Sequence, residues 1–249
     1  FNEAGTGKTS AAIWAADYLM NQGLVKRVLV ICPLSIMQSA WQADLFKTAM
    51  HRTCAIAHGT KRRKVIQGGY EFVIINYDGV AAEFETIKAH RFDLVIIDEA
   101  NAYKNPSTVR WKVLAKLLQP DTYLWMMTGT PASQSPEDAF GLAKLVNPDA
   151  VPKYKTAWKE KVMTQITRFK WIPKPNSRDT VFSALQPAIR YEKAQCVDLP
   201  ELTYQTRHVP LSPQATKYYK DLVREMQIQA AGETISTVNA ARSEEHTSE

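Results

Sequence analysis

The first part of the chain alternates between short apolar runs and longer stretches with apolar residues at helical spacing. The apolar runs predict strands at Val28–Cys32, Cys54–Ala57, Phe72–Ile75, Asp93–Ile97 and Tyr123–Met127. Helical periodicity predicts helices at Thr9–Asn21, Ile36–Met50, Lys112–Leu118 and Glu137–Val146. Strands that alternate with helices form a parallel sheet with right-handed crossovers. We therefore expect residues 1–150 to form an α/β, doubly wound domain.

The pattern changes after residue 150. Residues 151–200 carry longer basic and aromatic stretches that are interrupted by prolines. Beyond them, Thr203–Leu211 predicts a strand. Ser212 and Pro213 then predict an N-cap and a first-turn proline of a helix that runs to about Gln229. Residues 201–241 are expected to close the first domain with this strand and helix.

Both ends of the sequence look interrupted. A glycine-rich loop begins within the first nine residues with no strand before it, so the start is expected to be truncated. The last eight residues, Arg242–Glu249, read RSEEHTSE and lack apolar periodicity. A translated sequencing adapter gives the same eight residues. We interpret residues 242–249 as an assembly artefact without function.

The composition is that of an ordinary globular protein. The chain has 249 residues, of which 45% are hydrophobic and 22% charged, which excludes collagen-like and wholly disordered classes. The longest apolar runs are strand-sized, so no membrane-spanning segment is expected. Three cysteines without CxxC spacing predict neither a disulfide framework nor a zinc site, and a cytosol-like compartment is the default.

Positive charge is concentrated in one region. The net charge is +6, but Lys153 to Lys193 contains ten Lys or Arg and three acidic residues, a local balance of +7. The remainder is therefore close to neutral. Such a basic block is typical of a protein that binds a polyanion, most often nucleic acid, and equally of a solvated positive face.

The first candidate site is a phosphate loop. Ala4–Thr9 fits the second half of the GxxxxGK[ST] pattern, although Asn2 replaces its first glycine, and a helix follows directly. Glycines let backbone N–H groups turn toward phosphate oxygens, and the helix N-terminus favours negative charge. Lys8 is expected to reach the β- and γ-phosphates, and the Thr9 hydroxyl to bind Mg²⁺.

A pair of acids follows the fourth predicted strand. Asp98 and Glu99 stand where the strand that ends at Ile97 delivers them to the carboxyl edge of the sheet. Ligands of parallel sheets bind at that edge, so Asp98 and Lys8 can converge although they are far apart in sequence. Asp98 is expected to hold Mg²⁺, and Glu99 to orient and deprotonate the attacking water.

Five motifs occur in order along the chain: GTGKT, VLVICPLSIMQSAW, VIINYD, DLVIIDEANAYKN and LWMMTGTP. They resemble those of the SWI/SNF-type DNA translocases, a branch of helicase superfamily two. Cys32–Ser35 with Trp41 downstream, and Thr128–Pro131, favour that branch. The resemblance covers about residues 1–241, and Ile235–Ala241 is similar to the connection between lobes in phage and bacterial members.

The resemblance implies a RecA-like P-loop domain with a central parallel sheet flanked by helices, plus a helical, basic protrusion at residues 151–200. It assigns ATP binding to the loop Gly5, Thr6, Gly7, Lys8 and Thr9. It also implies that Thr128 and Thr130 couple nucleotide state to DNA. Asn101 occupies the position of the histidine in the DEAH-type box, so its contribution to this coupling departs from the family pattern.

The resemblance also implies partners. Pro33, Ser35, Asn76 and Tyr77 match loops that touch the DNA backbone in relatives, and such contacts position DNA without reading its sequence. Double-stranded DNA, ATP with Mg²⁺, and a second RecA-like lobe of the same parent chain are therefore expected. No membrane partner is expected, and the expected location is the cytoplasm of a bacterial or phage-infected cell.

Three functions compete. The leading one is the first lobe of an ATP-driven motor on double-stranded DNA, which alone should be nearly inactive as an ATPase. The second is a switch that grips DNA without hydrolysing ATP, although intact Lys8, Asp98 and Glu99 argue against it. The third is the motor lobe of a restriction or remodelling assembly. No strand-separating element is recognisable.

One basic, aromatic segment has two interpretations. Arg168-Phe169-Lys170-Trp171 interleaves aromatic and basic side chains, the composition of a surface that grips a nucleic-acid strand. The resemblance favours the other interpretation, in which Phe169 and Trp171 form the local core of the protrusion.

Overall fold

The computed structural model describes residues 5–132, 134–196, 205–225, 227–230 and 233–236. The chain divides into two compact units, Phe1–Leu199 and Pro200–Glu249. The expected artefact at residues 242–249 and the Ile235–Ala241 connection lie largely outside these ranges. No helix within the described ranges is long and apolar enough to span a bilayer.

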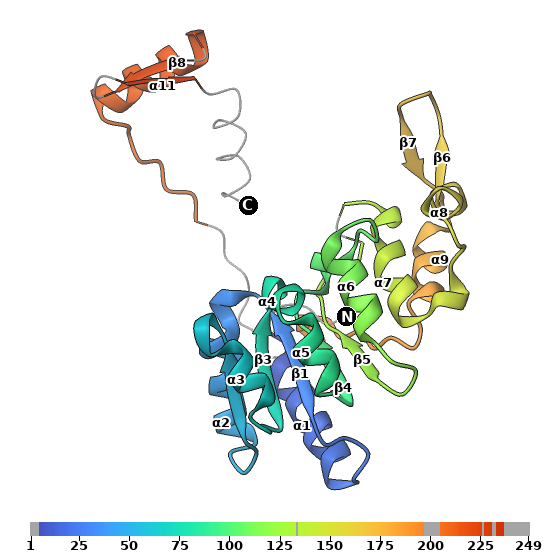
Figure 1. The fold of residues 1–249 in the computed structure, drawn as a ribbon. Helices are drawn as coiled ribbons and strands as arrows, with labels where there is room; N and C mark the ends of the chain where they lie inside the picture. Colours follow the sequence, from blue (N-terminus) through green and yellow to red (C-terminus); the bar gives the residue numbers. More distant parts are fainter. Residues whose placement is uncertain (1–4, 133, 197–204, 226, 231–232, 237–249) are drawn as a thin grey trace. The chain divides into compact units, whose positions relative to one another are not determined.

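A five-stranded parallel sheet forms the centre of the first unit, as the sequence pattern predicts (Figure 1). The strand order is β2-β3-β1-β4-β5. The strands are β1 (Val28–Cys32), β2 (Cys54–Ala57), β3 (Phe72–Asn76), β4 (Leu94–Ile97) and β5 (Tyr123–Met126). All five predicted strands are therefore confirmed, each within one residue at either end.

Helices pack on both faces of the sheet. The main ones are α1 (Lys8–Asn21), α2 (Ala43–Thr48), α3 (Arg62–Gln67), α4 (Tyr77–Ala82), α5 (Phe84–Ala89), α6 (Val109–Leu117) and α7 (Ala139–Val146). Side chains alternate along β1: Val28 and Val30 belong to the core layer under α1 and α2, whereas Leu29 and Ile31 belong to the layer under the other helices. This alternation explains why the strands are apolar throughout.

The helix expected over Ile36–Met50 is interrupted. It consists of a 3₁₀ turn η1 (Leu34–Ile36), a π-helix η2 (Met37–Gln42) and α2. Further 3₁₀ turns are η3 (Gly59–Lys61), η4 (Ala100–Tyr103), η5 (Pro136–Asp138) and η6 (Pro148–Ala150). Residue spacing alone does not distinguish these helix types over so few turns.

One glycine is required for close packing of α7. A Cβ at Gly141 would lie 2.2 Å from the carbonyl oxygen of Lys104, so α7 and the segment after η4 approach closely only with glycine. The carbonyl oxygen of Gly141 accepts a hydrogen bond from Nε1 of Trp111 at 2.8 Å. This contact fastens α6, α7 and the chain after β4 together.

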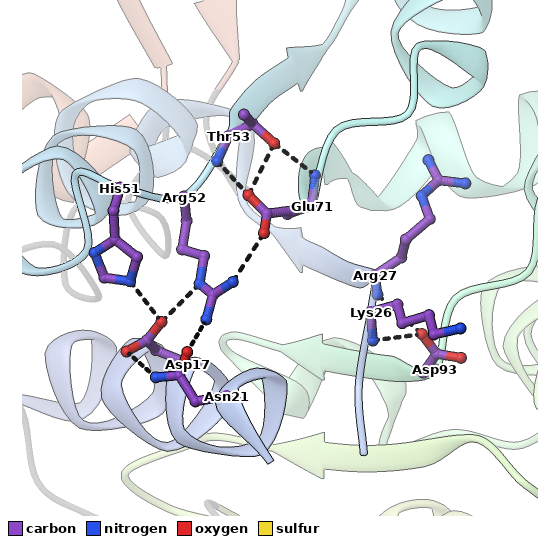
Figure 2. A network of polar contacts seen from close by, with 9 residues as sticks. All are labelled: Asp17, Asn21, Lys26, Arg27, His51, Arg52, Thr53, Glu71 and Asp93. Carbon is purple, nitrogen blue, oxygen red and sulfur yellow. Dashed lines mark hydrogen bonds and ion pairs between the residues drawn. The ribbon is translucent and has the colours of Figure 1, made fainter. Parts of the chain in front are cut away.

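A polar network joins the C-terminal part of α1 to the segments that precede β2 and β3 (Figure 2). The guanidinium of Arg52 donates to Oδ1 of Asp17 at 2.7 Å, to Oε1 of Glu71 at 2.9 Å, and to Asn21. Glu71 also accepts the backbone amide of Thr53 at 2.7 Å. Thr53 and Glu71 precede β2 and β3, so the network lies at the amino ends of the strands.

The basic region is partly helical, as expected, but contains a hairpin that the pattern did not predict. Its elements are α8 (Lys155–Val162), β6 (Met163–Gln165), β7 (Trp171–Pro173), α9 (Ser177–Ala184) and α10 (Lys193–Cys196). The strands β6 and β7 are antiparallel.

The second unit differs from the expectation. Residues 205–212 have no regular secondary structure, so the strand expected over Thr203–Leu211 is absent from the described part of that segment. The expected helix begins at Pro213 but ends at Glu225 as α11. A two-stranded hairpin, β8 (Gln227–Ala230) and β9 (Glu233–Ser236), follows it.

Candidate functional site

The phosphate loop adopts a backbone that glycine favours. Gly5 and Gly7 have φ angles of 77° and 76°, and α1 begins at Lys8 with Gly7 as its N-cap. A Cβ at Gly7 would meet nothing within 4 Å, so conformation and not crowding selects glycine there. The first turn of α1 has no acidic residue and no side-chain cap. This N-terminus therefore keeps its preference for an anion.

The direction of α1 places the loop at the carboxyl edge of the sheet. Asp17 and Asn21, near the C-terminal end of α1, contact Arg52 at the amino ends of the strands. The N-terminal end of the helix, with Lys8 and Thr9, consequently faces the edge at which β4 ends. Asp98 and Glu99 follow β4 at the same edge, as the sequence predicts.

Two donors fix the carboxylate of Asp98. Nε1 of Trp41 donates to Oδ2 at 2.9 Å, and the backbone amide of Glu99 donates to Oδ1 at 3.0 Å. Asp98 is 6% exposed and Trp41 is fully buried. Because each carboxylate oxygen has two acceptor sites, both retain capacity for one more partner. The possible metal ligands at this edge are the carboxylates of Asp98 and Glu99 and the hydroxyl of Thr9. These are oxygen ligands of the kind that Mg²⁺ prefers.

The turn after Asp98 is held by Tyr77. The hydroxyl of Tyr77 donates to the carbonyl oxygen of Asp98 at 2.6 Å and lies 3.3 Å from that of Glu99. Glu99 has a φ of 51°, a left-handed conformation that is uncommon for a residue with a side chain. Its side chain is exposed, which leaves the carboxylate accessible to a water molecule or substrate.

Burial keeps the neighbours of Asp98 protonated. Desolvation, with the charge of Asp98 as a second cause, raises the pKa of the Cys32 thiol to about 12. Desolvation, followed by the proximity of Tyr103 and Asp98, also raises the pKa of Tyr77. At neutral pH the Tyr77 hydroxyl is therefore a hydrogen-bond donor, as its contacts with the two carbonyl oxygens require.

The expected coupling residues meet at the next strand. The backbone amide of Ala100 donates to the carbonyl oxygen of Met127 at 2.9 Å, joining the acid segment to the end of β5. Thr128 is fully buried, and its Oγ1 accepts the amide of Thr130 at 3.3 Å. Oδ1 of Asn101 is buried without a hydrogen-bond partner among the described residues. Asn101 thus offers an unused acceptor beside this junction.

The residues expected to touch DNA reach the same edge, but Asn76 and Tyr77 have side-chain oxygens buried in or bonded within the lobe. Pro33 and Ser35 follow β1, whose last residue pairs with Asn76 at the end of β3. Oδ1 of Asn76 is buried and has no partner in the described ranges. The hydroxyl of Tyr77 is directed to the acid segment. The DNA contacts of these four residues stay a prediction.

The contact of Trp41 with Asp98 was not foreseen from the sequence. The resemblance implies Trp41 only as a feature of the family and assigns it no role. The available signal was a tryptophan, which has one donor, in an apolar stretch directly after β1. Its partner lies 57 positions along the chain and cannot be read from local periodicity.

Comparisons with known proteins agree with this arrangement. The family model described as SNF2-related domain matches residues 1–248. Chromodomain-helicase-DNA-binding protein 1-like of Mus musculus is 26% identical over 233 residues, covering 89% of this chain and 25% of that protein. The uncharacterized ATP-dependent helicase YqhH of Bacillus subtilis (strain 168) is 28% identical over 149 residues, covering 59% of this chain and 25% of that protein.

A solved structure is similar as well. It is the Sulfolobus solfataricus SWI2/SNF2 ATPase core in complex with dsDNA, at 25% identity and a TM-score of 0.66, covering 90% of this chain and 47% of that chain. The chain spans about a quarter of the length of the mouse and Bacillus subtilis relatives, and about half of the solved archaeal chain. Mouse, bacterial and archaeal relatives do not single out the expected phage or bacterial type. Because the family model matches almost every residue, the chain belongs to the SNF2-related domain family.

Proposed function

We propose that this chain is the ATP-binding lobe of a DNA-dependent ATPase that moves along double-stranded DNA. The proposal combines the phosphate loop with the acid pair, and it assigns DNA contacts to the segments after β1 and β3. These features lie at one edge of the sheet, which is where parallel α/β sheets bind ligands.

Particular residues would hold the nucleotide and the metal. Backbone amides of Gly5, Thr6 and Gly7 would surround phosphate oxygens, and Lys8 would contact the β- and γ-phosphates. Thr9 and Asp98 would hold Mg²⁺, which when bound neutralises phosphate charge. Glu99, exposed beside this group, would orient the attacking water and accept its proton.

The observation that carries the proposal is the double support of Asp98. Trp41 holds the carboxylate and follows the segment with Pro33 and Ser35, whereas Tyr77 holds the carbonyl oxygen of Asp98 and is itself expected to touch DNA. A shift of either segment on DNA would act directly on the carboxylate or on the backbone of Asp98. This is the physical connection that a DNA-stimulated ATPase requires, because each bond lost or gained there changes the geometry at the metal.

Charge and the solved complex support the DNA assignment. The basic region from Lys153 to Lys193 supplies the positive charge that binding to a polyanion requires. The similar archaeal ATPase core was solved in complex with dsDNA. Contacts through phosphates would make the binding indifferent to sequence.

Nucleotide binding to this chain tests the proposal. Titration calorimetry with Mg·ATP should detect binding to the wild type and none to Lys8→Ala, because the substitution removes the ammonium that would contact the β- and γ-phosphates. Lys26→Ala is the matched control, since Lys26 is an exposed lysine at the opposite edge of the sheet. Unchanged affinity in Lys8→Ala would remove the phosphate-loop assignment and with it the proposed motor.

A further inference from the structure

The basic region contains a tight antiparallel hairpin. In β6 and β7, Thr164 pairs with Ile172 and Gln165 with Trp171. Beyond these pairs, the amide of Ile166 donates to the carbonyl oxygen of Lys170 at 2.9 Å. Lys170 also donates its amide to Oγ1 of Thr167 at 3.1 Å, which closes the turn over residues 167–170. The turn is therefore held by hydrogen bonds between Lys170 on one strand side and Ile166 and Thr167 on the other.

The base of the hairpin is anchored on the lobe. Met163 at the start of β6 is buried, and Nζ of Lys174 donates to the carbonyl oxygen of Glu160 at 2.6 Å. The ammonium of Lys159 lies 4.8 Å from the centre of the Trp171 ring. Trp171, which pairs with Gln165 at the turn end of the two strands, is half-buried and packs against the core of the lobe, as the local-core interpretation expects. In Figure 1 the two strands extend away from α8 and α9.

Phe169 contradicts the local-core interpretation. Its side chain is 88% exposed, the most exposed large hydrophobic residue in the described part of the chain. The guanidinium of Arg168 lies 5.5 Å from the centre of its ring. Exposing an aromatic ring at the tip of a turn gains nothing for folding, because no apolar area is removed from water.

The surroundings of Phe169 are uniformly positive. From residue 161 to residue 178 the sequence has no acidic residue and five basic ones, Lys161, Arg168, Lys170, Lys174 and Arg178. A hairpin that carries only positive charge complements a polyanion. An exposed ring between two basic side chains is the arrangement by which proteins stack a nucleobase and pair with its flanking phosphates.

We propose that the tip of this hairpin binds DNA at unpaired bases, with Phe169 stacked on a base and Arg168 and Lys170 against phosphates. The proposal rests on the proposed function, since it adds a second contact to a lobe that binds duplex DNA elsewhere. Paired bases inside a duplex have no accessible face for the ring. The hairpin would therefore direct the lobe to forks, single-stranded gaps or ends, which duplex contacts alone do not distinguish.

Binding of the full chain to two DNAs tests this assignment. Fluorescence anisotropy measures the affinity of the chain for two DNAs of the same duplex sequence. One is a fork with single-stranded arms, and the other is a long blunt duplex. Phe169→Ala should weaken binding to the fork by about 5- to 150-fold, the contribution of stacking on one base, and change duplex binding by less than about twofold. Phe169→Trp should retain fork binding, because it keeps an aromatic face. Both variants should fold normally because the side chain is exposed.

Controls separate this proposal from the proposed function. Phe46→Ala removes an aromatic ring that is 73% exposed on α2 and should leave both affinities unchanged. Equal affinities of the wild type and Phe169→Ala for the fork, or an equal loss on both DNAs, would overturn base stacking. Either result would leave the proposed function intact, provided that the wild type binds the duplex. A wild type that binds neither DNA would overturn the proposed function and this proposal together.

Discussion

At the scale of single residues, the carboxylate of Asp98 is the most constrained group of the candidate site. A buried carboxylate is stable only when donors replace the water it has lost, and Trp41 and the amide of Glu99 supply them. The two donors also fix which way the oxygens face. Trp41 is accordingly a positioning residue for Asp98, the proposed Mg²⁺ ligand, and does not itself belong to the proposed ligands.

Replacement of Trp41 with phenylalanine tests this role. Trp41→Phe keeps an apolar ring and removes only the indole donor, so Asp98 loses one of its two fixed partners. We expect the affinity for Mg²⁺ in the presence of ATP to fall by about 10- to 100-fold, as it does when other partners of metal ligands are removed. Calorimetric titration of ATP at a series of Mg²⁺ concentrations measures it.

Two further measurements make the Trp41 result interpretable. ATP binding in excess chelator should be equal in Trp41→Phe and wild type, because the phosphate loop is untouched. Trp14→Phe, at a tryptophan that is 59% exposed on α1, should behave as wild type throughout. An unchanged Mg²⁺ dependence in Trp41→Phe would leave the indole with a purely structural role.

At the scale of elements, the sequence predicts the strands and the phosphate loop far better than the supports of the site. Continuous apolar runs and glycines are local signals, so β1 and the loop before α1 are predictable from the pattern. The contact of Trp41 depends on Asp98, a residue after β4, and no local signal encodes it. The π-helix η2 is too short for residue spacing to distinguish it from an α-helix. The hairpin of β6 and β7 was missed because each strand has three residues and little apolar alternation.

The network around Arg52 fixes the orientation of α1, and removing it should cost stability. Arg52→Met retains the apolar stem and loses the bonds to Asp17, Asn21 and Glu71. The Arg52 side chain is 14% exposed, so water replaces these bonds poorly. We expect the free energy of unfolding at neutral pH to fall by about 1–3 kcal/mol, measured by urea denaturation.

The same network predicts a dependence on pH. Burial raises the pKa of Asp17 and of Glu71, but their hydrogen bonds outweigh it, so both lie below the ordinary values of 3.8 and 4.5. A lowered pKa stabilises the fold above the unfolded value, and this contribution is lost as pH falls toward the folded value. The difference between wild type and Arg52→Met should therefore shrink below about pH 4. A difference independent of pH would contradict the ion-pair assignment.

A surface ion pair provides the control for this network. Arg91 and Asp121 form a pair at 3.3 Å with side chains that are mostly exposed. Arg91→Met should change the free energy of unfolding by less than about 0.5 kcal/mol, because exposed pairs contribute little.

At the scale of the whole molecule, the α/β fold and its parallel sheet follow from the sequence, whereas the second unit does not. The alternation of strands and helices determines the fold of the first unit, because each of these elements must bury an apolar face. Residues 205–212 are exposed and bury no apolar face, and they form no strand in the described part of the predicted segment. Short polar segments with one or two apolar residues do not determine their own structure.

The chain alone should be a poor ATPase. The family resemblance places the arginine fingers on a second lobe, and such a residue contributes about a thousandfold or more to phosphoryl transfer. We expect phosphate release by this chain to be near background and unchanged by duplex DNA, beside strong stimulation of a parent chain with both lobes. Robust DNA-stimulated hydrolysis by this chain would show that one lobe suffices. A two-lobed parent that binds ATP without turnover would instead identify a DNA-gripping switch.

The strand order has a consequence during synthesis of the chain. The central strand β1 pairs with β3 and β4, and Val28 meets Leu94 only 66 residues later, while β2 makes no pair with it. At about 5–20 residues per second, the ribosome needs on the order of 3–13 s to supply that partner. The nascent chain therefore carries an apolar strand with at least one unpaired edge for seconds. Lys26 and Arg27 before it and Pro33 after it occupy the positions of gatekeeper residues, which oppose aggregation of such a segment.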